Sequence, residues 1–96
     1  MIDLPDEQLE RVRRILARFV PEAEICVFGS RVHGGAAPYS DLDLAIVTNE
    51  RLPQAVYYRI LDAFEESDLP VRVDVLDWGR ISPAFREVIE REYEIL

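Results

Sequence analysis

Lysine is absent from this chain of 96 residues, so all eleven of its lysine or arginine positions are arginines. Nineteen acidic residues outnumber them and give a formal net charge of −8. Proteins that hold nucleic acids cluster cations against the phosphates. This balance therefore argues against stable binding of a long nucleic acid by the chain alone. Arginine without lysine favours planar, bidentate contacts to carboxylates or phosphates.

Cysteine occurs once, at Cys26, so no disulfide can form within the chain. This usage is typical of a reducing compartment, and we expect the protein to be cytoplasmic. No apolar run approaches the roughly 18 residues of a membrane span, so no contact with a membrane is expected. The first residues are acidic, which is unlike the basic start of a signal peptide.

The length predicts one domain, residues 1–96, with a single core. Helical and strand periodicities alternate along the chain, and Pro21, Gly34-Gly35 and Ser82-Pro83 interrupt them. The expected helices cover residues 5–19, 31–34 (one turn), 53–67 and 83–92, and the expected strands cover 25–28, 41–47, 71–76 and 93–96. These elements predict an α/β (α+β) fold: a mixed sheet of three to four strands, with helices packed on one side and a site at the open end of the strands.

Two carboxylates begin the second expected strand. Asp41 and Asp43 alternate with apolar residues, so both side chains point to the same face of the strand. Magnesium prefers oxygen ligands and is usually held by one or two carboxylates together with substrate phosphates. A third carboxylate, such as Asp74 on the next strand, would allow two metal ions about 3.5–4 Å apart. The alternative is that Asp41 and Asp43 are merely solvated at the mouth of a strand.

A glycine-serine turn precedes this pair. Gly29 lets the backbone approach a phosphate closely, and Ser30 offers a hydroxyl donor at the start of a helical turn. Such a turn by itself is a weak signal, because most glycine-serine turns are only turns. Its spacing from the carboxylate pair makes the pattern informative.

The whole stretch resembles a known signature. Gly29-Ser-Arg-Val-His-Gly-Gly-Ala-Ala-Pro-Tyr-Ser-Asp-Leu-Asp-Leu44 is similar to the motif of the DNA polymerase beta-like nucleotidyltransferases. Within that superfamily it is closest to the minimal nucleotidyltransferase group, whose members are often antitoxin partners of HEPN-type ribonuclease toxins. The resemblance covers nearly the whole chain, because the minimal domain of the group has about this size.

The resemblance implies a role for each matching residue. Gly29 and Ser30 would contact the phosphates of a nucleoside triphosphate, with Arg31 as a helper. Asp41 and Asp43 would bind magnesium, two ions in all. The third carboxylate of the family lies on the strand after the second long helix, where Asp74 stands; it would complete the catalytic metal site and help to activate the attacking hydroxyl.

Some positions leave the assignment open. Asp77 is the rival for the third carboxylate, although it falls at the end of the strand and Asp74 is preferred. Family members often carry an arginine where this chain has His33, and another basic residue near Ala37. His33 is therefore either a phosphate contact or an exposed loop residue. Arg72, beside Asp74, is either a brace for the site or half of a surface ion pair.

Three functions fit these residues. The first is magnesium-dependent transfer of a nucleoside monophosphate, AMP from ATP, to a hydroxyl. The resemblance implies a tyrosine on a HEPN-type toxin as the acceptor, with the chain as antitoxin. The second is a catalytically weak module that neutralises a partner ribonuclease by occupying it. The third is an antibiotic-type small-molecule nucleotidyltransferase, which at this length would need a partner subunit to complete the acceptor pocket.

Overall fold

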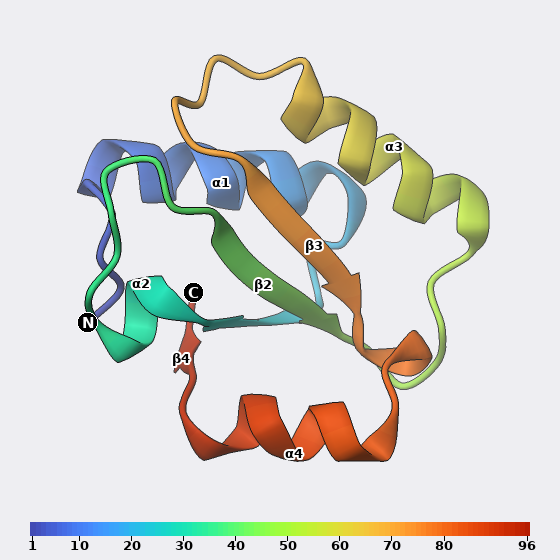
Figure 1. Ribbon diagram of the computed structural model, residues 1–96. Helices are drawn as coiled ribbons and strands as arrows, with labels where there is room; N and C mark the ends of the chain where they lie inside the picture. Colours follow the sequence, from blue (N-terminus) through green and yellow to red (C-terminus); the bar gives the residue numbers. More distant parts are fainter.

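The computed structural model describes all residues, 1–96, and shows a four-stranded sheet with helices packed against its faces (Figure 1). None of the helices has the length and apolarity that crossing a membrane requires. The helices are α1 (Asp6–Phe19), α2 (Ser30–His33), α3 (Gln54–Glu65) and α4 (Pro83–Arg91); the strands are β1 (Glu24–Phe28), β2 (Leu42–Val47), β3 (Val73–Asp77) and β4 (Glu94–Ile95); a short 3-10 helix, η1 (Trp78–Arg80), follows β3.

The sheet is mixed, with the strand order β3-β2-β1-β4. β1 pairs antiparallel with β2 and with β4, whereas β2 and β3 run parallel. The parallel pair requires a crossover connection, and α3 supplies it. The predicted α+β class, the mixed sheet and all eight predicted segments are confirmed, with boundaries that differ by one or two residues.

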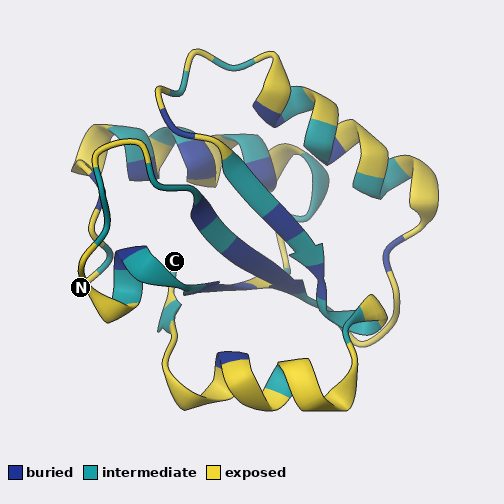
Figure 2. Cartoon of the chain, viewed as in Figure 1, coloured by how far each residue is buried: buried dark blue, intermediate teal, exposed yellow.

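The main core lies between the sheet and the pair α1 and α3. Helix α1 begins after Pro5, carries Asp6 and Glu7 in its first turn, and buries an apolar stripe against the sheet. Alternate residues of the strands complete this core. The core includes Leu9, Val12, Leu16, Val27, Leu42, Leu44, Ile46, Ile60, Phe64 and Val75. Figure 2 shows these buried segments as dark blue bands along the central strands and on the inner sides of the helices.

Helix α4 lies on the other face of the sheet (Figure 1). Only Ile89 of this helix is buried, and it packs in a smaller cluster with Cys26 and Ala45. We expected helices on one side, which holds for α1 and α3. The difference arises because β1 is apolar on both faces, and the Cys26 face also needs cover. Most of α4 stays exposed (Figure 2).

Candidate active site

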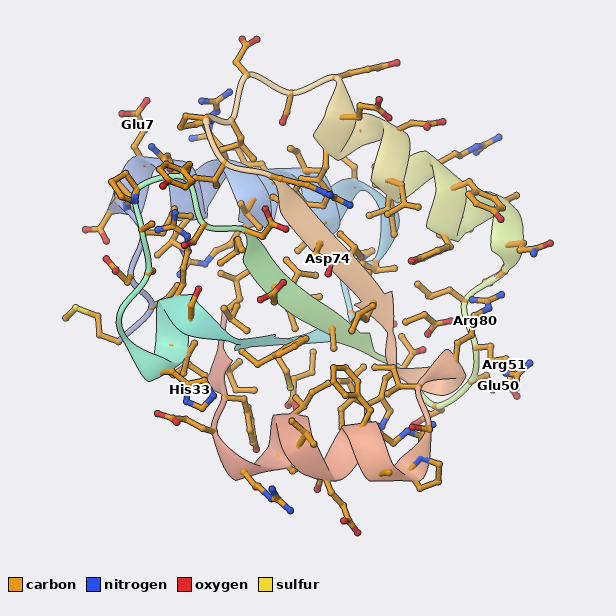
Figure 3. All side chains as sticks on the ribbon, viewed as in Figure 1. Glu7, His33, Glu50, Arg51, Asp74 and Arg80 are labelled. Carbon is orange, nitrogen blue, oxygen red and sulfur yellow. The ribbon has the colours of Figure 1, made fainter.

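Sheet pairing brings the predicted carboxylates together. Asp43 of β2 stands opposite Phe28 in the antiparallel pair and opposite Asp74 in the parallel pair. Strand alternation sends Leu42 and Leu44 into the main core, so Asp43 points to the other face of the sheet. Asp74, labelled near the middle of the sheet in Figure 3, stands next to it in register. Asp41 precedes β2 and is partly exposed.

Gly29 closes the site on the side of β1. Its φ of 81° lies in the region that favours glycine, and it turns the chain from β1 into α2. A Cβ atom at this position would stand 3.2 Å from Cγ of Asp43 and still closer to a carboxylate oxygen. Only glycine therefore lets the Asp43 carboxylate lie against the turn that begins at Gly29-Ser30.

Negative charge is concentrated at Asp43. Burial first, and then the neighbouring charges of Asp74 and Asp41, together raise the pKa of its carboxyl from the ordinary 3.8 to about 6. Without a cation, the Asp43 carboxyl therefore binds a proton more readily than an ordinary aspartate does. A bound cation would lower the pKa again by attracting the charged form.

The donor set at this place suits a hard divalent cation. Asp41, Asp43 and Asp74 are close enough to influence one another and offer carboxylate oxygens, which are the ligands that Mg²⁺ prefers. No three acidic, histidine or cysteine side chains form a closed ligand group here. Magnesium does not need one, because it usually keeps waters and takes substrate phosphates beside one or two carboxylates. These residues thus fit the expected metal.

Asp77 has a different environment from Asp74. Its side chain is buried, and it accepts hydrogen bonds from the backbone N–H of Leu52 at 3.0 Å and of Gly79 at 3.1 Å. It also pairs with the guanidinium of Arg80. With its oxygens occupied in this way, Asp77 caps η1 and ties the loop before α3 to β3. This geometry favours Asp74 over Asp77 as the third carboxylate.

Arg31 is also occupied. Its guanidinium is almost fully buried and donates to the carbonyl oxygens of Asp3, Ser40 and Pro38, at 2.7, 2.9 and 3.1 Å, with a longer bond to Ala37. In this structure it braces the loop that leads into Asp41. Nothing in the sequence distinguished this structural use from a phosphate contact, because both exploit the planar fork of arginine.

His33 lies away from the carboxylates. Its side chain is exposed and its Nδ1 contacts the carboxylate of Glu92, beyond the end of α4 (Figure 3). Its assignment as a phosphate contact stays a prediction, and in this conformation it would have to leave Glu92. Arg72 is exposed and makes no ion pair.

One hollow borders the site. A groove of about 480 Å³ lies between α3 and β3, and both Asp74 and Arg72 line it, together with Tyr57. The hydroxyl of Tyr57 donates to the carbonyl of Val75 at 2.8 Å, which fixes α3 against β3. The largest hollow of the molecule lies elsewhere, between α1 and α3. Asp43 points to the face of the sheet away from these two helices, so it does not line that hollow.

The sequence is similar to those of known nucleotidyltransferases. The family model of the nucleotidyltransferase domain matches residues 9–96. A Haemophilus influenzae protein, named probable protein adenylyltransferase MntA, is 47% identical over 95 residues, which cover 99% of this chain and 83% of the relative.

Two solved structures share the fold. One, a toxin-antitoxin crystal structure with AMP-PNP, has a TM-score of 0.74 at 20% identity and covers 96% of this chain and 72% of that one. The other, a spectinomycin adenyltransferase from Enterococcus faecialis with ATP and spectinomycin, has a TM-score of 0.58 at 20% identity, covering 93% of this chain and 47% of that one. The chain therefore belongs to the nucleotidyltransferase domain family, as the signature from Gly29 to Leu44 indicated.

Proposed function

We propose that the protein uses Mg²⁺ to transfer AMP from ATP to a hydroxyl on a partner protein. The observation that carries this proposal is the register of the sheet, which sets Asp43 beside Asp74 and against the turn at Gly29. A nucleotidyltransferase needs carboxylates and a phosphate-binding turn within one small volume, and these residues meet that need. The name of the 47%-identical relative supports a protein as the acceptor.

Each residue of the site has a task in this proposal. The turn at Gly29 and Ser30 binds the β- and γ-phosphates through main-chain N–H groups and the serine hydroxyl. Asp41, Asp43 and Asp74 would hold the metal, and Asp74 also lines the groove between α3 and β3. Bound there, Mg²⁺ would neutralise charge on the triphosphate and orient it for in-line attack.

Asp74 also stands where an acceptor would enter. It lines the 480 Å³ groove, whereas Asp43 is covered by the turn on its other side. An acceptor hydroxyl placed in that groove would lie within reach of the Asp74 carboxylate, which would orient it and draw on its proton. In this assignment Asp43 acts on the nucleotide and Asp74 acts on the acceptor.

The partner is proposed to be a HEPN-type ribonuclease toxin, with this chain as its antitoxin. The 0.74 TM-score shows that the chain has the fold of a chain in a toxin-antitoxin structure. AMP attached to a side chain of the toxin adds a phosphate charge and considerable bulk. Either change at a ribonuclease site would obstruct RNA binding.

A transfer assay tests the activity. Purified protein, Mg²⁺ and ATP labelled at the α-phosphate are mixed with a lysate of the source cells. We expect label on one protein band, none with γ-labelled ATP, and none with Asp41→Asn/Asp43→Asn. Asp6→Asn, an exposed aspartate of α1 that lines neither groove, is the matched control and should label like the wild type.

Two outcomes would redirect the proposal. Absence of label with all four nucleotides, while the protein still binds one lysate protein, would favour the binding module that neutralises by occupancy. Label on a small molecule instead of a protein would favour the antibiotic-type reaction. Mass spectrometry of the labelled species separates these outcomes and identifies the modified side chain.

A further inference from the structure

The largest hollow of the molecule is a groove between α1 and α3, with a volume of about 750 Å³. Four of the eleven arginines line it: Arg11, Arg14, Arg18 and Arg59. Three of them share one side of α1 at spacings of three and four residues, which places them on one face of the helix. In a chain of net charge −8, this concentration of cations in one groove is a departure from the rest of the surface.

The α3 side of the same groove carries Arg59 but is otherwise acidic. Asp62 and Glu66 lie four residues apart near the end of α3, and Asp68 follows the helix. The floor between the two sides is apolar, with Ile15 and Phe19 packed against the main core. The groove is therefore an apolar strip with a basic wall on α1 and an acidic wall at the end of α3.

These charges are not paired within the molecule. Among all the residues that line the groove, only Arg14 has an ion-pair partner, Glu10 at 3.8 Å, and that residue lies outside the groove. The Arg14 side chain is 75% exposed, and Arg18 lies over the ring of Phe19 at 5.3 Å. Six of the seven charged groups thus remain free to pair with a ligand.

We propose that this groove is a docking site for an amphipathic helix of a partner protein, a helix with an acidic flank against α1 and a basic flank against the end of α3. An apolar ridge with flanks of opposite charge is how helices select partners in grooves and coiled coils. A nucleic acid fits less well, because Asp62, Glu66 and Asp68 would repel its phosphates at the end of α3.

The groove and the carboxylates lie on opposite sides of the sheet. Ile15 packs in the core that α1 and α3 share with Leu42 and Leu44, whereas Asp43 points to the side of α4. A helix in the groove therefore leaves the carboxylates accessible. Docking and transfer would be separate functions of one small chain, and the docking proposal does not depend on the transfer activity.

The test is binding of a designed peptide to the full chain. The probe is a helical peptide about as long as α1, built on alanine with a leucine stripe, glutamates along one flank and lysines along the other. A peptide of the same composition with scrambled order is the control probe. We expect the patterned peptide to bind more tightly, and in ¹⁵N NMR spectra to shift signals of α1 and α3 but not those of Asp41 to Asp43.

Charge-reversal variants test whether the arginines of α1 bind the acidic flank of the peptide. Arg14→Glu/Arg18→Glu should weaken binding of the patterned peptide roughly tenfold or more, and a peptide with lysines on both flanks should recover it. Arg13→Glu is the matched control, because Arg13 lies on the same helix but does not line the groove; it should bind like the wild type. Arg14→Glu alone serves if the double variant does not fold, as judged by circular dichroism.

Several results would overturn the proposal. Equal binding of patterned and scrambled peptides, or no binding of either, would show that the charge pattern recognises no helix. Tighter binding of a 20-nucleotide RNA at the same signals would make the groove a nucleic-acid site. A wild-type dimer that Arg14→Glu/Arg18→Glu converts to a monomer would make it a contact between two copies of this chain.

Discussion

At the scale of single residues, Asp43 is the most constrained side chain of the site. Its carboxylate lies against Gly29, beside Asp74, and its pKa is raised to about 6. Neighbouring carboxylates of like charge repel each other, and a fold retains them when a cation or substrate compensates for this repulsion. The local cost in stability therefore has a functional explanation in the metal that the residues fit.

Asp43→Asn should abolish transfer and stabilise the metal-free protein at neutral pH. The folded pKa of about 6 exceeds the ordinary 3.8, so native Asp43 keeps a proton that the unfolded chain releases. The stability that this proton provides is present below pH 3.8 and is lost as pH rises through 6. The variant should therefore gain roughly 1 kcal/mol over the wild type at pH 7, a small value because the side chain is partly exposed to solvent.

The measurement is urea unfolding of both proteins between pH 4 and 8 with EDTA present. The difference in unfolding free energy should grow as pH rises through 6. Asp62→Asn, an exposed carboxylate of α3, should show no such trend. An equal difference at all pH values would mean that Asp43 is not held against its neighbours as described.

Gly29→Ala should remove activity while the chain still folds. The added methyl group meets the Asp43 carboxylate, and the φ of 81° disfavours any residue with a Cβ. We expect a loss of about 1–3 kcal/mol of stability from the backbone and a much larger relative loss of transfer rate. Gly35→Ala, at a φ of 78° but with nothing within 4 Å, is the control for backbone strain alone. Full activity in Gly29→Ala would show that the turn at Gly29 takes no part in transfer.

At the scale of elements, β3 carries two carboxylates with different tasks. Asp74 faces the groove beside Asp43, and Asp77 is buried under three hydrogen-bond donors. Strand β3 therefore combines a candidate reactive group with a structural cap three residues later. The same strand positions both because its parallel pairing with β2 fixes the register.

Asp74→Asn and Asp77→Asn should separate chemistry from stability. Asp74→Asn should stop transfer and leave nucleotide binding and folding nearly unchanged. Asp77→Asn should cost about 3 kcal/mol or more, because it leaves a buried donor set and Arg80 without their charged partner. The readouts are transfer rate, nucleotide affinity and chemical unfolding. Wild-type turnover in Asp74→Asn would reassign the third carboxylate to Asp77.

The loop from Gly34 to Asp41 is held by hydrogen bonds from the guanidinium of Arg31. Arg31→Lys keeps the charge but loses the planar fork that reaches several carbonyl oxygens. We expect a loss of about 2 kcal/mol of stability, and a transfer rate that falls because Asp41 is held less well. Arg91→Lys, an exposed arginine at the end of α4, is the control. A variant with normal stability but weak nucleotide binding would support the predicted phosphate contact instead.

At the scale of the whole molecule, the candidate site at Asp43 and the largest groove lie on opposite sides of one sheet. The groove lies between α1 and α3, which cover one face, whereas α4 lies on the other (Figure 1). The main core is built by α1, α3 and the sheet, so the other face of the sheet is left for the carboxylates and α4.

Magnesium and ATP together should stabilise the whole fold. A ligand at about 100 times its dissociation constant adds about 2.7 kcal/mol, which for a domain of this size raises the melting temperature by more than about 10 °C. ATP with EDTA, or Mg²⁺ alone, should raise it far less. The shift should vanish in Asp41→Asn/Asp43→Asn. An equal shift with ATP and EDTA would show that nucleotide binding needs no divalent cation.

Local sequence patterns predict the helices, the strands and the part of the site that lies between Gly29 and Asp43. Periodicity predicts each helix and strand, because burial of an apolar face is a local pattern, and alternation places Asp41 and Asp43 on one face before any tertiary contact is known. The signature from Gly29 to Leu44 indicated the family for the same reason: its spacing lies within one continuous segment.

The way in which distant segments meet follows from the folded structure alone. The register of β2 with β3 sets Asp74 beside Asp43, and the burial of Asp77 and Arg31 gives them structural contacts that identical residues at the surface would lack. The second face of the sheet, covered by α4, and the charged groove of α1 and α3 have the same origin. These features depend on contacts between residues far apart in the chain, and local sequence patterns carry no record of them.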